Sequence, residues 1–107
     1  MAFSRIAYDI LAYLVDNKAT VIMSAEAISE MMEDPKIGVV STGTIYKIVN
    51  ELWGVGLVAQ GAKKGTANTY YITQAGIKHL SEALGVDESE LMSIIESEIV
   101  GGNSYEK

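Results

Sequence analysis

The sequence has no cysteine, a single histidine and no long apolar segment. The absence of cysteine excludes disulfide bonds and thiolate chemistry. With His79 as the only imidazole, a metal site would have to consist of carboxylates alone. No apolar run approaches the roughly 20 residues that span a bilayer, and residues 1–5 lack the layout of a signal peptide. We therefore expect a cytoplasmic protein with no membrane segment, metal or cofactor.

The chain is long enough for one small hydrophobic core. It has 107 residues, of which 49% are hydrophobic. A domain of this size buries a modest share of its surface, so association of two cores would stabilise it. We therefore expect a single domain that forms a homodimer.

The charge is divided unevenly along the chain. A net charge of −6 argues against binding to nucleic acid, whose affinity comes largely from neutralised phosphates. Residues 35–80, however, contain five lysines against Glu51 alone, which gives +4, and the remainder contains three basic residues against thirteen acids, which gives −10. This segregation favours a basic face for a polyanion, and chance clustering of lysines is the alternative.

Apolar spacing and capping residues predict the order of the elements. We expect a helix at 3–16, a short strand at 20–23, a second helix from Ser24 to Asp34, a third helix from 42 to 53, strands at 57–60 and 68–73 around the loop 61–67, a fourth helix from Thr73 to Leu84 and a fifth helix from Asp87 to Val100. This order predicts a mainly α fold with a small β-hairpin. It is typical of a winged helix-turn-helix with one or two C-terminal helices for dimerisation.

The third helix carries the main functional prediction. Ser41 or Thr42 caps its first turn, and a buried stripe is expected at Ile45, Ile48, Val49 and Leu52. Apart from Glu51, the opposite face holds side chains that donate to phosphates or reach base edges. The predicted DNA-contacting residues of this helix are Thr42, Thr44, Tyr46, Lys47 and Asn50. An ordinary solvated helix face is the alternative interpretation.

The loop 61–67 is basic and contains two glycines, so we expect it to form the tip of a wing. Lys63 and Lys64 have no acidic neighbour in the sequence, and we expect both to contact the DNA backbone together with Thr66. Of the adjacent Tyr70 and Tyr71, one should lie in the core and one along the wing. Trp53 is expected to close the core.

Residues 42–52, followed by Gly56-Leu57-Val58, resemble the recognition-helix signature of PadR-like winged-helix transcriptional regulators. Residues 68–76 are similar to the wing strand of that family, with paired aromatics, a threonine cap and a glycine in the next helix. The resemblance implies a DNA-binding regulator with an effector pocket between subunits, although no residue of the sequence locates that pocket. A plasmid, phage or archaeal regulator of related shape would fit the same residues.

The predicted organisation is a DNA-binding domain at 1–84, a dimerisation helix at 85–100 and a disordered tail at 101–107. The dimer interface is expected to combine the first and fifth helices. Its predicted residues are Ile6, Ile10, Leu91, Met92, Ile95 and Ile99.

The sequence offers little support for catalysis. His79 has no nucleophile near it, and the acids of residues 87–98 lack the spacing of a calcium loop. The expected function is therefore sequence-specific binding of double-stranded DNA by a transcriptional repressor. The alternatives are a winged-helix module that binds protein, and a plasmid or phage adaptor for DNA partition or replication.

Overall fold

The computed structural model describes residues 3–91 of the chain. Its elements are, in chain order, α1 (Arg5–Asp16), the 3-10 turn η1 (Ile22–Ser24), β1 (Glu26–Ala27), α2 (Ile28–Met31), α3 (Thr42–Gly54), β2 (Val58–Gln60), β3 (Thr69–Ile72) and α4 (Gln74–Leu84). The predicted mainly helical winged-helix fold is confirmed.

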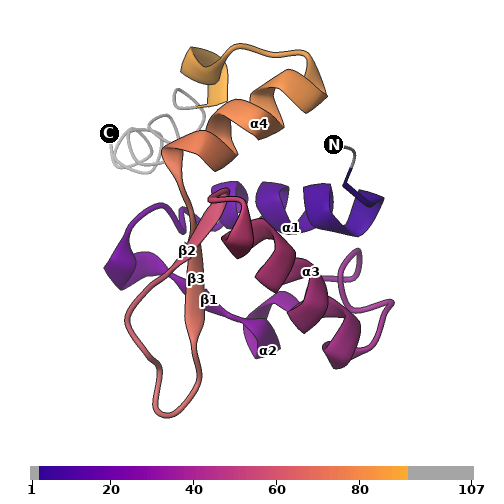
Figure 1. Ribbon diagram of the computed structural model, residues 1–107, viewed down its shortest axis with the longest axis vertical. Coiled ribbons are helices and arrows are strands. Elements are labelled where there is room, and N and C mark those ends of the chain that lie inside the picture. Colours follow the sequence, from indigo (N-terminus) through magenta and orange to yellow (C-terminus); the bar gives the residue numbers. More distant parts are fainter. Residues whose placement is uncertain (1–2, 92–107) are drawn as a thin grey trace, which may run out of the picture.

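The sheet has three short antiparallel strands in the order β1-β3-β2. Tyr70 of β3 lies opposite Glu26 on one side and opposite Gln60 on the other, so β3 is the central strand. The hairpin of β2 and β3 extends away from α4, and its tip lies at the opposite end of the molecule from α4 (Figure 1). This tip is the wing, and it comprises residues 61–68.

The core lies between α1, α3, α4 and the sheet. Leu11, Leu14, Ile45 and Leu52 have no exposed surface, and Tyr70 of the sheet is 2% exposed. The predicted inner stripe of α3 is therefore confirmed. Burial of apolar side chains from three helices and the sheet fixes the orientation of α3, and thereby the face that it presents to solvent.

Three helix ends follow the sequence prediction. The Ser41 hydroxyl oxygen accepts a hydrogen bond from the Thr44 amide at 3.2 Å, and the Thr73 hydroxyl oxygen accepts one from the Gly76 amide at 3.1 Å. Gly85 ends α4 with a φ of +74°, a left-handed conformation that favours glycine. Local capping chemistry therefore sets the boundaries of α3 and α4.

The region before α3 differs from the prediction. The strand expected at 20–23 lies at Glu26–Ala27, and the second helix is a single turn, Ile28–Met31. Ser24 does not cap that helix, because its hydroxyl oxygen accepts hydrogen bonds from the amides of Thr20 and Val21, both at 3.2 Å. Pairing with β3 holds the following residues extended and delays the helix to Ile28.

Beyond α4 the chain turns back onto the core. Residues 88–91 begin another helical turn, and Leu91 is 4% exposed within the core cluster. The remainder of the predicted fifth helix and the tail at 101–107 lie outside the described residues. No helix among residues 3–91 has the length and apolarity needed to cross a membrane.

Candidate nucleic-acid interface

The outer face of α3 is exposed along its full length. Thr42, Thr44, Lys47 and Asn50 are exposed, and Tyr46 keeps 45% of its surface in contact with solvent. The prediction that these five side chains face solvent is confirmed. The Thr44 hydroxyl lies 3.0 Å from the hydroxyl of Ser41, the N-cap residue. This hydrogen bond uses part of the hydrogen-bonding capacity of Thr44.

The wing places Lys63 and Thr66 in solvent. The loop closes where Lys64 and Ala67 exchange backbone hydrogen bonds of 3.1 and 3.0 Å around Gly65, whose φ is +63°. Lys63 precedes this turn and Thr66 is one of its two central residues, and both are exposed. No salt bridge joins Lys63 to another residue of the described part of the chain. Lys63 is therefore a cation available to a polyanion.

Lys64 does not have the environment that the sequence predicted. Its ammonium nitrogen lies 2.9 Å from both carboxylate oxygens of Glu30 and 3.9 Å from a carboxylate oxygen of Glu26. The expectation that Lys64 lacks an acidic partner is wrong, because the fold brings α2 and β1 to the base of the wing. Glu30 is 34 residues away in the sequence, so no local pattern indicates this pair.

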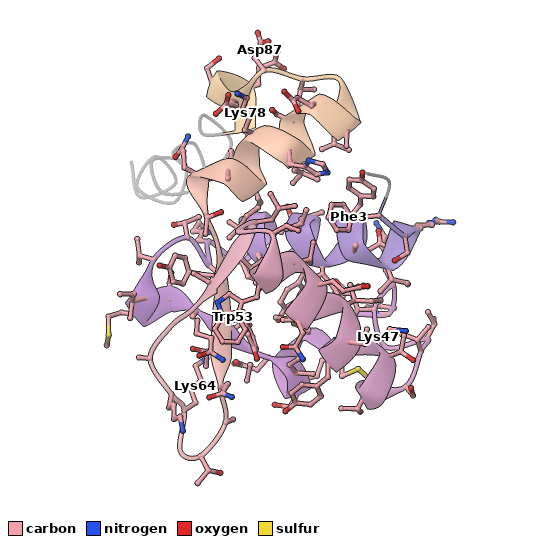
Figure 2. All side chains as sticks on the ribbon, viewed as in Figure 1. Phe3, Lys47, Trp53, Lys64, Lys78 and Asp87 are labelled. Carbon is pink, nitrogen blue, oxygen red and sulfur yellow. The ribbon has the colours of Figure 1, made fainter. Side chains whose placement is uncertain are left out.

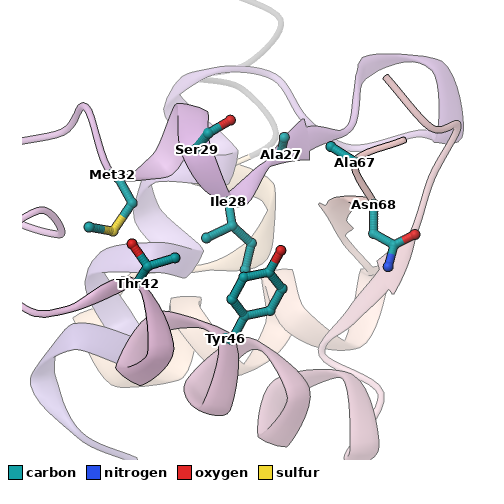
Figure 3. Close-up of a pocket in the computed structure, with 8 residues that line it drawn as sticks. All are labelled: Ala27, Ile28, Ser29, Met32, Thr42, Tyr46, Ala67 and Asn68. Carbon is teal, nitrogen blue, oxygen red and sulfur yellow. The ribbon is translucent and has the colours of Figure 1, made fainter. Parts of the chain in front are cut away.

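A groove separates α3 from the wing. It is a pocket of about 310 Å³ lined by residues of β1, α2, α3 and the wing, namely Ala27, Ile28, Ser29, Met32, Thr42, Tyr46, Ala67 and Asn68. Figure 3 shows Thr42 and Tyr46 rising from α3 toward α2, with Asn68 across from Tyr46 on the wing strand. Half of the residues that line the groove are apolar, and Ser29, Thr42, Tyr46 and Asn68 supply uncharged hydrogen-bonding groups.

Trp53 lies on the same side of α3 as Tyr46 and does not close the core. It is 45% exposed and makes an edge-to-face contact with Tyr70 at a centroid distance of 6.4 Å. The spacing of Tyr46, Asn50 and Trp53 at i, i+4 and i+7 indicates one helical stripe, and this signal could have identified Trp53 from the sequence. Ser29 and Asn68 carried no such signal.

The charged side chains of the interface lie apart from those of α4. In Figure 2, Lys47 lies on α3 and Lys64 on the wing, whereas Lys78 and Asp87 lie at the opposite end of the molecule. Lys47 forms no salt bridge within residues 3–91. Because Glu26 and Glu30 neutralise Lys64, Lys47 and Lys63 are the cations that this face offers.

The structure changes the predicted dimer interface. Ile10 has no exposed surface and Leu91 is 4% exposed, so both serve the core of their own chain, and their assignment to an interface is wrong. Ile6 is half-buried and lines a pocket of about 270 Å³ with Arg5, Asp9, Lys36 and Val39. Met92, Ile95 and Ile99 lie outside the described residues.

His79 has a packing role. Its ring stacks on Tyr8 at a centroid distance of 5.8 Å and meets the edge of Phe3 at 5.4 Å. Its Nε2 atom lies 3.4 Å from the Tyr8 hydroxyl. Within residues 3–91, no group of three or more His, Asp or Glu side chains is arranged to hold a metal ion.

Comparison with known proteins finds similar solved structures but no matching sequence. The sequence matches no protein-family model and no curated protein sequence. TubR from Bacillus megaterium pBM400 shares the fold with a TM-score of 0.66 and 21% identity, over 77% of this chain and 87% of that one. A DNA-binding TubR fragment from Clostridium botulinum, solved in solution, has a TM-score of 0.58 and 26% identity, over 78% of this chain and 99% of the fragment.

A third structure, M. tuberculosis Rv0081, has a TM-score of 0.56 and 18% identity, over 90% of this chain and 83% of that one. The chain therefore has the winged-helix fold of the TubR proteins.

Proposed function

We propose that this chain binds double-stranded DNA sequence-specifically, as a homodimeric transcriptional repressor. In this proposal α3 enters the major groove and the wing lies on the DNA backbone. The observation that carries the proposal is the outer face of α3, where five polar side chains are exposed above a fully apolar inner stripe. A helix that only faces solvent does not need five side chains that can bind bases or phosphates next to a wing.

Four of these five side chains have groups that suit base edges. The Lys47 ammonium donates to guanine, and the Asn50 amide forms two hydrogen bonds with adenine. The methyl groups of Thr42 and Thr44 contact thymine methyl groups. These residues would distinguish base pairs from one another.

The groove between α3 and the wing suits a DNA strand. Its uncharged groups would donate hydrogen bonds to the DNA backbone, and Lys63 would neutralise a phosphate beside them. These groups are the hydroxyls of Ser29, Thr42 and Tyr46 and the Asn68 amide. Trp53, which is exposed on the same side of α3 as Tyr46, would pack against a deoxyribose. The likeness to the DNA-binding TubR fragment supports DNA binding by this fold.

The similar solved structures support a winged-helix DNA-binding regulator, and the repressor role and the homodimer are the more specific parts of the proposal. The TubR proteins and Rv0081 are the structural neighbours, whereas the signature in residues 42–58 supports a PadR-like regulator as the more specific assignment. We also propose that the chain is not an enzyme, because its one histidine is packed between Phe3 and Tyr8.

The test is an electrophoretic mobility shift with DNA from upstream of the protein's own gene, at a low and a high salt concentration. We expect binding that weakens steeply with salt. Lys47→Ala should weaken the binding, and the matched control Lys78→Ala, on α4 at the opposite end of the molecule, should not. Absence of binding at low salt, or equal effects of the two substitutions, would contradict the proposal.

A protein-binding winged helix is the second candidate, and the net charge of −6 together with the pairing of Lys64 with Glu30 favours it.

A partition or replication adaptor would use the same DNA-binding face as a repressor. A reporter gene behind the upstream DNA separates these two, because a repressor lowers its expression and an adaptor leaves it unchanged.

A further inference from the structure

The base of the wing contains an ion-pair cluster of Lys64, Glu26 and Glu30. Lys64 extends from the wing to Glu30 of α2, with which it makes two contacts of 2.9 Å, and to Glu26 of β1 at 3.9 Å. The three residues come from three different elements, so their contacts connect the wing to the helix-turn-helix core.

The two carboxylates are held in place independently of Lys64. Glu30 accepts a hydrogen bond of 2.7 Å from the Ala27 amide, which also caps α2. Glu26 accepts one of 2.7 Å from the Tyr13 hydroxyl on α1. The Ala27 amide and then the Lys64 ammonium lower the pKa of Glu30, and the bond to Glu30 raises the pKa of Lys64. Lys64 therefore meets an acceptor pair that the protein has already oriented.

The balance of charge disfavours a phosphate at Lys64. One ammonium faces two carboxylates, so the cluster carries a local charge of −1. A DNA phosphate approaching Lys64 would also approach Glu26 and Glu30, and like charges at such distances repel. Lys63, the next residue, has no salt bridge with a described residue and lies in solvent.

We propose that Glu30, supported by Glu26, is a positioning residue for the wing. It holds the Lys64 side chain against α2 and β1, so that Lys63 alone provides the wing's charged phosphate contact. This inference rests on the proposed DNA binding. It makes the wing a preorganised element, because the ordering of the tip is complete before DNA arrives.

The first test compares the salt dependence of DNA binding in wild type, Lys63→Gln and the double variant Glu30→Gln/Lys64→Gln. The double variant keeps the local charge at −1, and the new amide side chain at position 30 retains an oxygen for the Ala27 amide. We expect Lys63→Gln to lower the salt slope by about 0.9, the value for one phosphate contact, and the double variant to leave it unchanged. A double variant that lowers the slope as much as Lys63→Gln does would overturn the proposal.

The second test needs no DNA and measures amide hydrogen exchange at Ala67, whose amide donates to the Lys64 carbonyl. We expect exchange several-fold faster in the double variant, with amides of α1 unchanged. Lys64→Arg keeps a cation that can pair with both carboxylates, and it should preserve wild-type exchange.

Unchanged exchange at Ala67 in the double variant would overturn the positioning role. If the wild-type protein binds no DNA at either salt concentration, the proposed function fails. The exchange measurement still decides whether Glu30 positions the wing.

Discussion

At residue 76 the fold requires a side chain no larger than hydrogen. A Cβ added to Gly76 would collide with the Leu57 carbonyl oxygen and with the Ile72 side chain, where α4 begins beside β2. We expect Gly76→Ala to lower the free energy of unfolding by about 1–3 kcal/mol, the usual range for overpacking. Urea denaturation measures this loss.

Gly43 provides the matched control for Gly76. It also lies in the first turn of its helix, but a Cβ there meets no atom within 4 Å. Gly43→Ala should therefore raise the free energy of unfolding, by up to about 1 kcal/mol. Similar values for the two alanine variants would show that the close approach at Gly76 relaxes without cost.

Asn50 is the residue at which base reading is tested most directly. Its side chain is exposed one turn beyond Tyr46 on α3, where an amide can form a bidentate pair with adenine. Asn50→Ala should weaken binding to the cognate site by about 1–3 kcal/mol and to random duplex DNA by much less. Fluorescence anisotropy on both duplexes measures the difference. Equal losses would assign Asn50 to positioning the helix.

At the scale of elements, the contact between α2 and the wing gives a pH dependence with a definite sign. The pKa of Glu30 lies below its ordinary 4.5 in the folded protein, so the stabilisation by its charged form is present above pH 4.5 and is lost as the pH falls through the lowered value. Wild type should therefore exceed Glu30→Gln in stability at about pH 7, and the excess should shrink at about pH 3.

Urea unfolding of the two proteins at both pH values tests this expectation. Because the Glu30 and Lys64 side chains are 35% and 48% exposed, the effect should be small. Glu33→Gln is a suitable control, since Glu33 is exposed and accepts no side-chain hydrogen bond from a described residue. An excess stability that is the same at both pH values would rule out a contribution from ionised Glu30.

The same elements show how far the sequence predicts the structure. The Ser41 cap, the inner stripe of α3 and the ends of α4 depend on residues close together in the chain, and each was predicted correctly. The shortened α2 and the strand at Glu26–Ala27 depend on pairing with Tyr70 and Thr69. Such a contact leaves no periodic signal in residues 20–34, where local capping residues favoured a longer helix.

In the candidate interface, too, the sequence predicts the residues that depend on local spacing and misses those that depend on distant contacts. Exposure of Tyr46, Lys47 and Asn50 follows from the burial of Ile45 and Val49 at helical spacing, so the sequence predicts it. The pairing of Lys64 with Glu30 does not follow from any local pattern, because the fold alone brings α2 to the wing. A non-local contact therefore accounts for the incorrect expectation at Lys64.

For the whole molecule, the remaining prediction is the homodimer. Ile6 on α1 is half-buried, and beside it Val39 is 71% exposed at the rim of the same pocket. If a second copy covered Val39, its apolar surface would be removed from water. This burial would stabilise a domain that is too small to bury much of its own surface. At the other end of α1, Met23 of η1 is 82% exposed and offers a competing apolar contact.

Single charges at these two positions distinguish the faces. Sedimentation at roughly tens of micromolar, where weak protein contacts saturate, should give a dimer for wild type and for Met23→Glu. Val39→Glu should give a monomer, because a carboxylate placed in an apolar contact must lose its hydration. Both side chains are exposed in the single chain, so circular dichroism should show both variants folded. A monomeric Met23→Glu with a dimeric Val39→Glu would move the interface to η1, and a monomeric wild type would leave each α3 to contact DNA alone.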